Sequence, residues 1–345
     1  MQIQPVTLSA PSRIHFGLLP ASQESPGTFG GCGLMVEEPR TVVRLRRSRT
    51  LSIRGNQRDR VAFVIEKWFE HFGRACLPGP RYADWSSLPI EIETIELPPS
   101  HVGFGSGTQL AMGVATALFA ATDIPCASPE SIASTLSRGT RAMVGTRGFG
   151  GGGFVADWGN SEAMNSKESI EQLDFPSDWP VVLIVPKVHV GLHGAAEANA
   201  FESETVHCQQ RRHEMQFLLS DRLLPAIREN NYSDFGPALY EFGLASGSLF
   251  RRSQHHNFHS RAVTEIVGFV RSNGVTAVVQ SSWGPTVAAI TETPDIADSL
   301  CLRLRERLPD GTMVVITRAD NRGATIELDR GQNAQTDFQK SLHNS

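Results

Sequence analysis

The sequence has few cysteines, no pair of them in C-x-x-C spacing, and no apolar run long enough to span a membrane. Its five cysteines are scattered singly, which favours reduced structural thiols over a disulfide framework. It also lacks a strong charge of either sign. A net charge of −4 over 345 residues excludes a global field that would recruit nucleic acid or an anionic membrane. The first residues lack the basic start and apolar run of a signal peptide, so we expect a cytoplasmic protein.

What is present is the composition of a globular chain. Hydrophobic residues make up 40% and charged residues 20% of the sequence, which leaves little room for extended disorder. A chain of 345 residues exceeds one ordinary hydrophobic core, so we expect two domains around a cleft. Any anion site must then be local.

Hydrophobic periodicity in the first half alternates between strand and helix. Period-two alternation predicts strands over 41–54 and 90–93, and helical spacing predicts helices over 60–72, 109–121 and 128–144. Ser128 followed by Pro129 is the start signal of the last of these helices. The glycine cluster 145–153 is expected to be irregular, because glycine gives up backbone entropy without burying a side chain.

The second half predicts an α+β arrangement. The polar stretch 159–178 indicates a connection between domains. After it, the pattern predicts strands at 181–185, 275–279, 287–290, 312–316 and 325–328, and helices at 199–230, 234–250, 260–273 and 294–308. We therefore expect an N-terminal domain over 1–175, a C-terminal domain over 176–330 and a polar tail over 331–345.

The strongest chemical signal is the glycine loop Pro99–Thr108, which leads directly into an alanine-rich helix. Amides at a helix start point outward without intrahelical acceptors, and the helix dipole adds positive potential, so this loop predicts a phosphate or diphosphate site. The hydroxyls of Ser106 and Thr108 can assist. The alternative is an ordinary loop in which Ser106 or Thr108 is a helix cap.

This string, Pro99-Ser100-His101-Val102-Gly103-Phe104-Gly105-Ser106-Gly107-Thr108, resembles the second motif of the GHMP kinases, P-x-x-x-G-L-G-S-S. Phe104 replaces the leucine and Gly107 replaces the second serine. In that superfamily the loop wraps a nucleotide's phosphates and the second serine often helps to hold magnesium. The substitution at Gly107 therefore weakens a kinase interpretation.

Further segments are similar to the β-ribofuranosylaminobenzene 5′-phosphate synthases, a family with the GHMP-kinase fold. The similar segments span nearly the whole chain and comprise 11–19, 29–35, 105–111, 138–146, 151–157, 191–197 and 280–286. The last contains Trp283-Gly284-Pro285 where GHMP kinases carry a glycine-rich third motif, which again favours the synthases. The resemblance implies a ribosomal-protein-S5-like N-terminal domain and a ferredoxin-like C-terminal domain.

The resemblance also implies an activity. It is a condensation of 5-phosphoribosyl 1-diphosphate with 4-aminobenzoate, releasing diphosphate and carbon dioxide, in methanopterin biosynthesis. The implied cofactor is Mg²⁺, and the implied assembly is a homodimer. Whether the acceptor is 4-aminobenzoate or 4-hydroxybenzoate stays open.

This chemistry has physical needs that assign roles to particular residues. Diphosphate must be held as it leaves, and guanidinium groups match phosphate and carboxylate. The assigned catalytic residues are Arg13, His15 and His193. The assigned substrate-binding residues are Gly103, Gly105, Ser106, Gly107, Thr108, Arg138, Arg141, Arg147, Ser281, Ser282 and Trp283. The assigned metal ligands are Asp157 and Glu197.

Each assignment has a plainer alternative. Most arginines are solvated, a single histidine is commonly structural, and a lone carboxylate is commonly a cap. Two other functions fit the same fold. One is an ATP-dependent small-molecule kinase, and the other is a ligand sensor without catalysis. Phosphate transfer from ATP would indicate the first, and tight binding without turnover the second.

Overall fold

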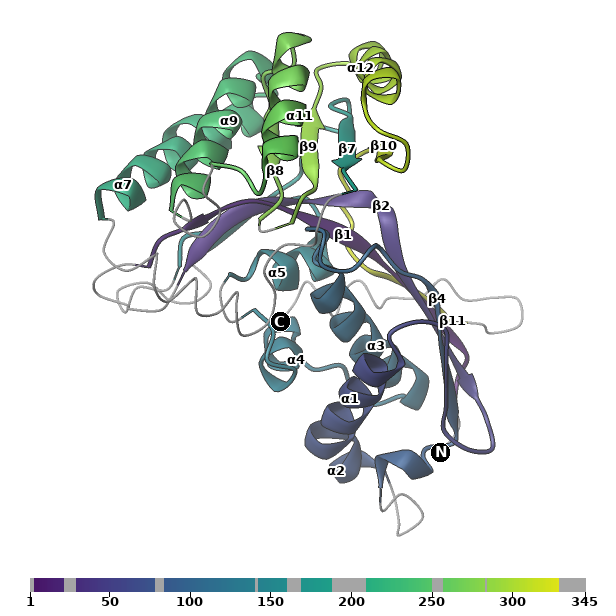
Figure 1. Ribbon diagram of the computed structural model, residues 1–345. Coiled ribbons are helices and arrows are strands. Elements are labelled where there is room, and N and C mark those ends of the chain that lie inside the picture. Colours follow the sequence, from purple (N-terminus) through teal and green to yellow (C-terminus); the bar gives the residue numbers. More distant parts are fainter. Residues whose placement is uncertain are drawn as a thin grey trace.

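The computed structural model describes residues 3–21, 29–77, 84–139, 142–159, 169–187, 209–249, 257–282 and 284–328. It is an α+β structure with two β-sheets and helices packed against both (Figure 1). The first half contains β1 (Val6–Leu19), β2 (Gly30–Arg47), β3 (Ser52–Arg54), α1 (Arg58–Trp68), η1 (Phe69–Gly73), α2 (Arg74–Cys76), η3 (Trp85–Ser87), β4 (Ile90–Glu96), α3 (Ser106–Thr122), α4 (Pro129–Thr135), α5 (Val144–Gly151), β5 (Phe154–Asp157) and β6 (Ile170–Leu173).

The second half begins with a strand and continues with helices. It contains β7 (Val181–Val185), α7 (Gln209–Phe217), η4 (Leu218–Leu223), α8 (Leu224–Arg228), α9 (Tyr232–Ser248), α11 (Arg261–Ser272), β8 (Val278–Gln280), β9 (Val287–Ile290), α12 (Pro294–Arg307), β10 (Met313–Thr317) and β11 (Thr325–Leu328). In the described ranges, no helix is long and apolar enough to cross a bilayer.

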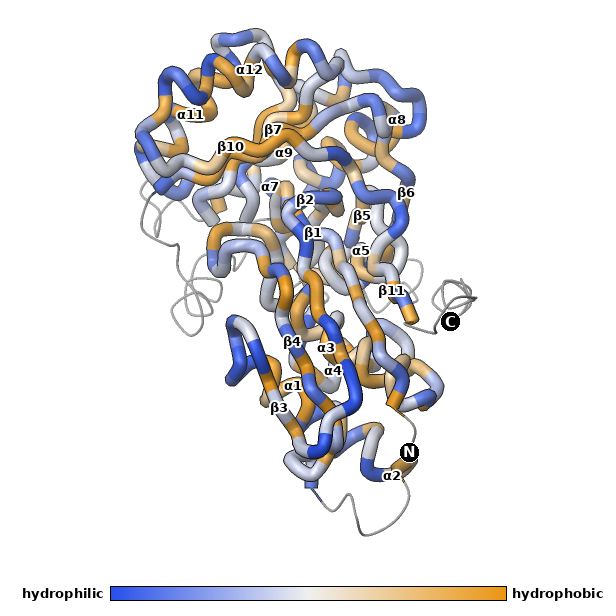
Figure 2. The backbone as a smooth tube through the Cα atoms, turned by 90° about the vertical axis from the view of Figure 1, so that its right-hand side faces the viewer, coloured by the Kyte–Doolittle hydropathy of each residue, from blue (hydrophilic) through white to orange (hydrophobic). Residues whose placement is uncertain are grey.

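The larger sheet has seven strands, in the order β11-β1-β2-β4-β3, with β5 on β2 and β6 on β5. Strand β2 is 18 residues long and pairs with two strands on the same side. Its first part pairs with β5, and its second part pairs with β4. The smaller sheet has the order β10-β7-β9-β8. Figure 2 shows β7 and β10 as a hydrophobic band; β7 is buried along its whole length, whereas β10 at the edge of the sheet is only partly buried.

The long strands β1 and β2 run between two groups of helices (Figure 1). Leu8 and Ala10 of β1 belong to a core with α1 and α3, whereas Ile14 and Phe16 belong to a core with α9 and β7. A register shift in the β1–β2 ladder lies between Ala10 and Ser12. A bulge of this kind increases the local twist and redirects side chains. Arg13 therefore follows the point where β1 passes from one core to the other.

The helices and strands confirm most of the sequence pattern. The largest error concerns 145–153, expected to be irregular, because α5 occupies most of this segment. Its glycines are explained by packing: a Cβ atom on Gly148 would overlap the Met35 side chain. The helix expected over 128–144 ends at Thr135 and is followed by Ser137 and Gly139, both with positive φ. The expected connection 159–178 contains β6.

The domain boundary at residue 175 stays a prediction, and one strand from the second half of the chain belongs to the sheet of the first half. Strand β11 lies late in the chain but pairs with β1 in the larger sheet. The ladder aligns Val6 with Leu328 and Ser9 with Thr325. The last strand of the range expected for the C-terminal domain thus belongs to the sheet that carries Arg13.

Candidate functional site

Three segments that are distant in the sequence meet at the middle of β1. The Arg13 amide donates to the Phe104 carbonyl over 3.0 Å, and the His15 amide donates to the Ser281 hydroxyl oxygen over 3.0 Å. The Ser281 hydroxyl in turn donates to the Gly103 carbonyl over 2.6 Å. Ser281 therefore bridges β1 to the loop that precedes α3. It is fully buried, so it holds the site together rather than presenting a hydroxyl to a substrate.

Gly284 brings the loop 280–286 against the loop 102–105. A Cβ atom on Gly284 would overlap the backbone of Val102 and Gly103. The Thr286 amide also donates to the Val102 carbonyl over 3.2 Å. The segment that stands where GHMP kinases carry their third motif thus uses Gly284 for close backbone contact.

The start of α3 carries backbone amides without intrahelical acceptors. Gly105 has φ 65°, in the left-handed region, and its carbonyl accepts the amides of Thr108 and Gln109 over 3.0 and 3.1 Å. Within the described part of the chain, the amides of Ser106 and Gly107 have no acceptor, as expected for the first positions of a helix. These amides and the dipole of a 17-residue helix favour negative charge here.

Arg13 of β1 and Arg60 of α1 lie against this helix start. A Cβ atom on Gly105 would lie 3.1 Å from Arg13 Nε, and one on Gly107 would lie 3.4 Å from Arg60 Nη1. Burial and the positive charge of Arg60 lower the pKa of Arg138, which places Arg138 within the electrostatic reach of α1. Among residues with described positions, no carboxylate lies within 4.0 Å of Arg60 or Arg138.

Arg60 was not among the residues expected at the site. Its position in the expected helix 60–72 is typical of a solvated helix face. One signal was available: Arg58 and Arg60 both lie in the first turn of α1, where the helix dipole disfavours cations. An arginine at the positive end of a helix dipole is unfavourable unless an anion binds beside it, so the position of Arg60 indicates an anion nearby.

Arg147 and Asp157 have partners away from the helix start. Arg147 forms an ion pair of 2.9 Å with Glu130 of α4. Asp157 accepts the Met143 amide on Oδ2 over 2.6 Å and the Gly159 amide on Oδ1 over 2.9 Å. Burial raises the pKa of Asp157 despite these two hydrogen bonds. The carboxylate thus fixes the start of α5 next to α3.

These partners bear on the expected metal site. Each oxygen of Asp157 already accepts one backbone amide, so a cation could use only the remaining lone pairs of this carboxylate. Over the described ranges, no group of three His, Cys, Asp or Glu side chains is arranged to hold a metal ion. A Mg²⁺ site can consist of one or two carboxylates together with waters and substrate phosphates, and the other expected ligand, Glu197, lies outside the described residues. The metal role of Asp157 stays a prediction.

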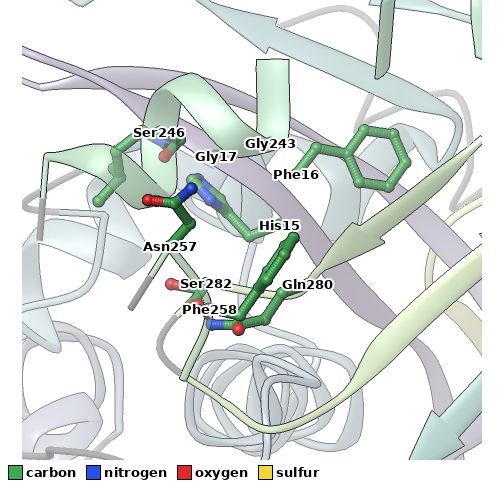
Figure 3. A pocket seen from close by; sticks show the side chains of 11 residues that line it. His15, Phe16, Gly17, Gly243, Ser246, Asn257, Phe258, Gln280 and Ser282 are labelled. Carbon is green, nitrogen blue, oxygen red and sulfur yellow. Dashed lines mark hydrogen bonds between the residues drawn. The ribbon is translucent and has the colours of Figure 1, made fainter. Parts of the chain in front are cut away.

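His15 lies on β1 two residues after Arg13. The residue is 4% exposed, and burial and the Arg13 charge hold its pKa well below 6.5. The ring is therefore neutral at neutral pH. It lines a cavity of about 30 Å³, which has room for one or two waters (Figure 3). The cavity lies between β1, α9 and the loop 280–286, with Ser246, Asn257, Phe258, Gln280 and Ser282 in its wall.

Four assigned residues, Arg141, His193, Glu197 and Trp283, lie outside the described residues. Of the others, the structure brings Arg13, Gly103, Gly105, Ser106, Gly107 and Thr108 to the start of α3 or the loop before it, and the binding role of Arg138 stays a prediction. It places His15 and Ser282 at the small cavity.

Comparison with known proteins agrees with this architecture. Residues 223–310 match the family described as GHMP kinases C terminal. Among solved structures, homoserine kinase from Cytophaga hutchinsonii superposes with a TM-score of 0.66 at 15% identity, over 94% of this chain and 98% of that one. Mevalonate diphosphate decarboxylase from Staphylococcus aureus gives a TM-score of 0.66 at 12% identity, with the same coverage of both chains. At these identities the likeness concerns the fold alone.

The sequence relatives extend over almost the whole chain. A beta-ribofuranosylphenol 5'-phosphate synthase of Archaeoglobus fulgidus is 29% identical over 340 residues, or 93% of this chain and 99% of the relative. A protein of the same name from Methanothermobacter thermautotrophicus is 23% identical, over 92% of this chain and 97% of the relative. The chain therefore has the GHMP-kinase fold and resembles beta-ribofuranosylphenol 5'-phosphate synthases over nearly its whole length.

Proposed function

We propose that this protein transfers a ribose 5-phosphate unit from 5-phosphoribosyl 1-diphosphate to a para-substituted benzoate, with loss of carbon dioxide. The observation that carries the proposal is the start of α3. Two amides without described acceptors lie there beside the arginines Arg13 and Arg60. Guanidinium groups and helix amides are the standard partners of phosphate oxygens.

The bonds of this reaction balance without a proton donor. The bond between the anomeric carbon and the diphosphate oxygen breaks, and the diphosphate leaves with the electron pair. The ring carbon that bears the carboxylate forms the new carbon–carbon bond. The bond to the carboxylate carbon then breaks, which releases carbon dioxide and returns its electron pair to the ring. A neutral His15 is compatible with this balance.

The chain's own residues would act on the leaving group. Arg13 and the amides of Ser106 and Gly107 stabilise negative charge that grows on the diphosphate as the bond breaks. Because these groups are already in place, little reorganisation is needed during the reaction. Asp157 and Ser281 are positioning residues, since they hold the start of α5 and the loop before α3.

The acceptor's para substituent is part of the proposal. The relatives are named for a ribofuranosylphenol product, which favours 4-hydroxybenzoate, and 4-aminobenzoate is the alternative expected from the sequence. Mg²⁺, a homodimer and a place in methanopterin biosynthesis remain expectations of the resemblance. Mg²⁺ commonly keeps several waters and binds through substrate phosphates, so its requirement has to be measured directly.

The test uses the purified full chain, 5-phosphoribosyl 1-diphosphate, and 4-hydroxybenzoate or 4-aminobenzoate labelled at the carboxyl carbon. Reactions run with Mg²⁺ and with a chelator. Labelled carbon dioxide, diphosphate and a ribosylated aryl product should appear in equal amounts. ATP with homoserine or mevalonate diphosphate serves as the kinase control. Absence of labelled carbon dioxide and aryl riboside under every condition would rule out the proposed transfer.

A further inference from the structure

We infer that Gln280 is a positioning residue for this site: its side-chain amide holds Ser282 in a strained backbone conformation, and Ser282 in turn fixes the loop 280–286 against β1. The inference rests on the proposed function only for the reaction that this geometry serves. Gln280 was not among the residues expected at the site.

The backbone at Ser282 is unusual for a residue with a side chain. Its φ is 52°, in the left-handed region. In this region the Cβ atom of an L-residue lies too close to the following carbonyl oxygen, so the conformation is unfavourable. A residue keeps such a conformation only where its surroundings over-determine it, and such residues cluster at functional sites. The contacts that hold Ser282 are therefore part of how the site is built.

Both backbone groups of Ser282 have a hydrogen-bond partner. Its amide donates to the His15 carbonyl over 3.0 Å. Its carbonyl accepts the Gln280 Nε2 group over 2.7 Å (Figure 3). The first bond ties Ser282 to β1, and the second comes from a side chain two positions earlier on the same loop. Together they fix the orientations of the peptide groups on either side of Ser282.

The Gln280 side chain makes a second hydrogen bond, which fixes its own position. Its Oε1 atom accepts the His259 amide over 2.6 Å. Because one partner is a donor and the other an acceptor, the side chain must present its oxygen to His259 and its nitrogen to Ser282. His259 lies directly before Ser260, whose side chain caps α11. Gln280 therefore connects the start of α11 to the loop 280–286.

The loop held in this way reaches the segment that precedes α3. Ser281 lies between Gln280 and Ser282. Its hydroxyl oxygen accepts the His15 amide over 3.0 Å, and its hydroxyl donates to the Gly103 carbonyl over 2.6 Å. A rotation of the backbone at Ser282 would move Ser281, because the peptide bond that joins them is planar. Loss of the Gln280 amide should therefore shift the loop before α3 relative to β1 in a chain that is still folded.

The test is a double-mutant cycle on the full chain, with Gln280→Met, Ser282→Gly and the double variant. Methionine keeps about the length of glutamine but has no donor for the Ser282 carbonyl. Glycine adopts the left-handed conformation without a steric cost, so it removes the strain that the glutamine opposes. Gln172→Met is the matched control, because Gln172 Nε2 also donates to a backbone carbonyl, that of Gly152, over 2.6 Å.

Two constants are measured for each protein: the KM for 5-phosphoribosyl 1-diphosphate in the transfer reaction, and the dissociation constant of inorganic diphosphate by calorimetric titration. Gln280→Met should raise both by about threefold to tenfold, the usual worth of one hydrogen bond. In the Ser282→Gly background the same substitution should change both by less than about twofold, because residues that act through each other are not additive.

These constants separate a positioning role from a structural one. A variant that is only less stable has a smaller folded fraction and a lower apparent kcat, but its folded molecules bind with unchanged constants. Gln172→Met should behave in this way. Wild-type constants in Gln280→Met, an equal effect of that substitution in both backgrounds, or the same increase in Gln172→Met would each overturn the inference.

The proposed function is scored on the wild type. Transfer by the wild type with unchanged constants in Gln280→Met would leave the proposed function and remove the positioning role. If the wild type neither transfers nor binds diphosphate, the proposed function fails, and denaturant unfolding then tests the contact of Gln280 with Ser282 itself. Gln280→Met should lower the denaturant midpoint more in the wild-type background than in the Ser282→Gly background, and equal shifts would overturn that contact as well.

Discussion

Two glycine-containing loops meet at this site, and they use glycine for different purposes. The loop before α3 has Gly105 in the left-handed region, and the amides that follow it face outward beside arginines. The loop 280–286 has Gly284 pressed against the backbone of the first loop, and Ser281 directs its hydrogen bonds inward. In the proposed function, the first loop binds the diphosphate and the second holds the first in place. A glycine-rich string therefore indicates a phosphate site only when its amides remain free of protein acceptors.

Substitutions at the loop before α3 and at Arg13 should lower activity strongly and change stability little. Arg13→Ala should lower turnover by about 10²–10³-fold, because it removes a cation from the leaving diphosphate. The melting temperature should change little. Steady-state kinetics and thermal unfolding of the same preparation measure both quantities, with Arg13→Lys as a partial replacement. If the melting temperature fell along with turnover, Arg13 would be a structural residue and not a residue that binds the diphosphate.

The supporting loop should show the opposite behaviour. Gly284→Ala should lower the free energy of unfolding by about 3 kcal/mol, because its Cβ meets backbone atoms that cannot turn aside. The control is Gly268→Ala on the exposed face of α11, where a Cβ meets nothing within 4 Å. That variant should gain about 0.5–1 kcal/mol. Denaturant unfolding that ranks both variants alike would contradict the close contact.

Asp157 belongs to the support as well. Asp157→Asn should cost about 2 kcal/mol, because an amide oxygen can replace only one of the two acceptors that Met143 and Gly159 use. Asp178→Asn at an exposed position is the control. The measurement is chemical unfolding alongside the Mg²⁺ dependence of activity. Normal stability with a raised Mg²⁺ requirement would instead make Asp157 a metal ligand.

The smallest expected effect is a pH dependence of stability. The pKa of His15 is lower in the folded chain than in the unfolded chain, so acid favours unfolding. Stability should fall as the pH drops from about 6.5 toward the folded pKa, and this contribution should be constant above that window. Burial lowers the pKa of His259 in the same direction, so His15→Gln should remove only part of the slope. An unchanged slope would mean that the His15 ring protonates freely.

Local sequence rules located the regular elements well where one signal dominated. Ser128 and Pro129 begin α4 as expected, with the Ser128 hydroxyl oxygen accepting the Ser131 amide. The rules failed at α5. The cost of glycine in a helix can be read from the local sequence, but the packing contact that compensates for it is made with a residue far away in the chain. Gly148 permits close contact with Met35, a residue more than a hundred positions earlier. No periodicity within 145–153 contains that information.

The candidate site was predictable in part for the same reason. The loop, Gly105 and Arg13 carry their signal in adjacent residues, and the structure places them together. Arg60 acquires its position through the packing of α1 on α3, and Ser281 through a contact with His15 across most of the chain. Both depend on tertiary neighbours. One sequence could suggest an anion site but not the residues that complete it.

The pairing of β11 with β1 has a consequence for synthesis. A ribosome makes β1 first and β11 near the end, yet residues 325–328 cover one edge of the strand that carries Arg13. Until they emerge, that edge keeps unpaired backbone groups, which are a template for aggregation. Strand β1 can complete its pairing only after β11 has been made. A nascent chain stalled before residue 325 would therefore hold Arg13 on a sheet that lacks its last strand.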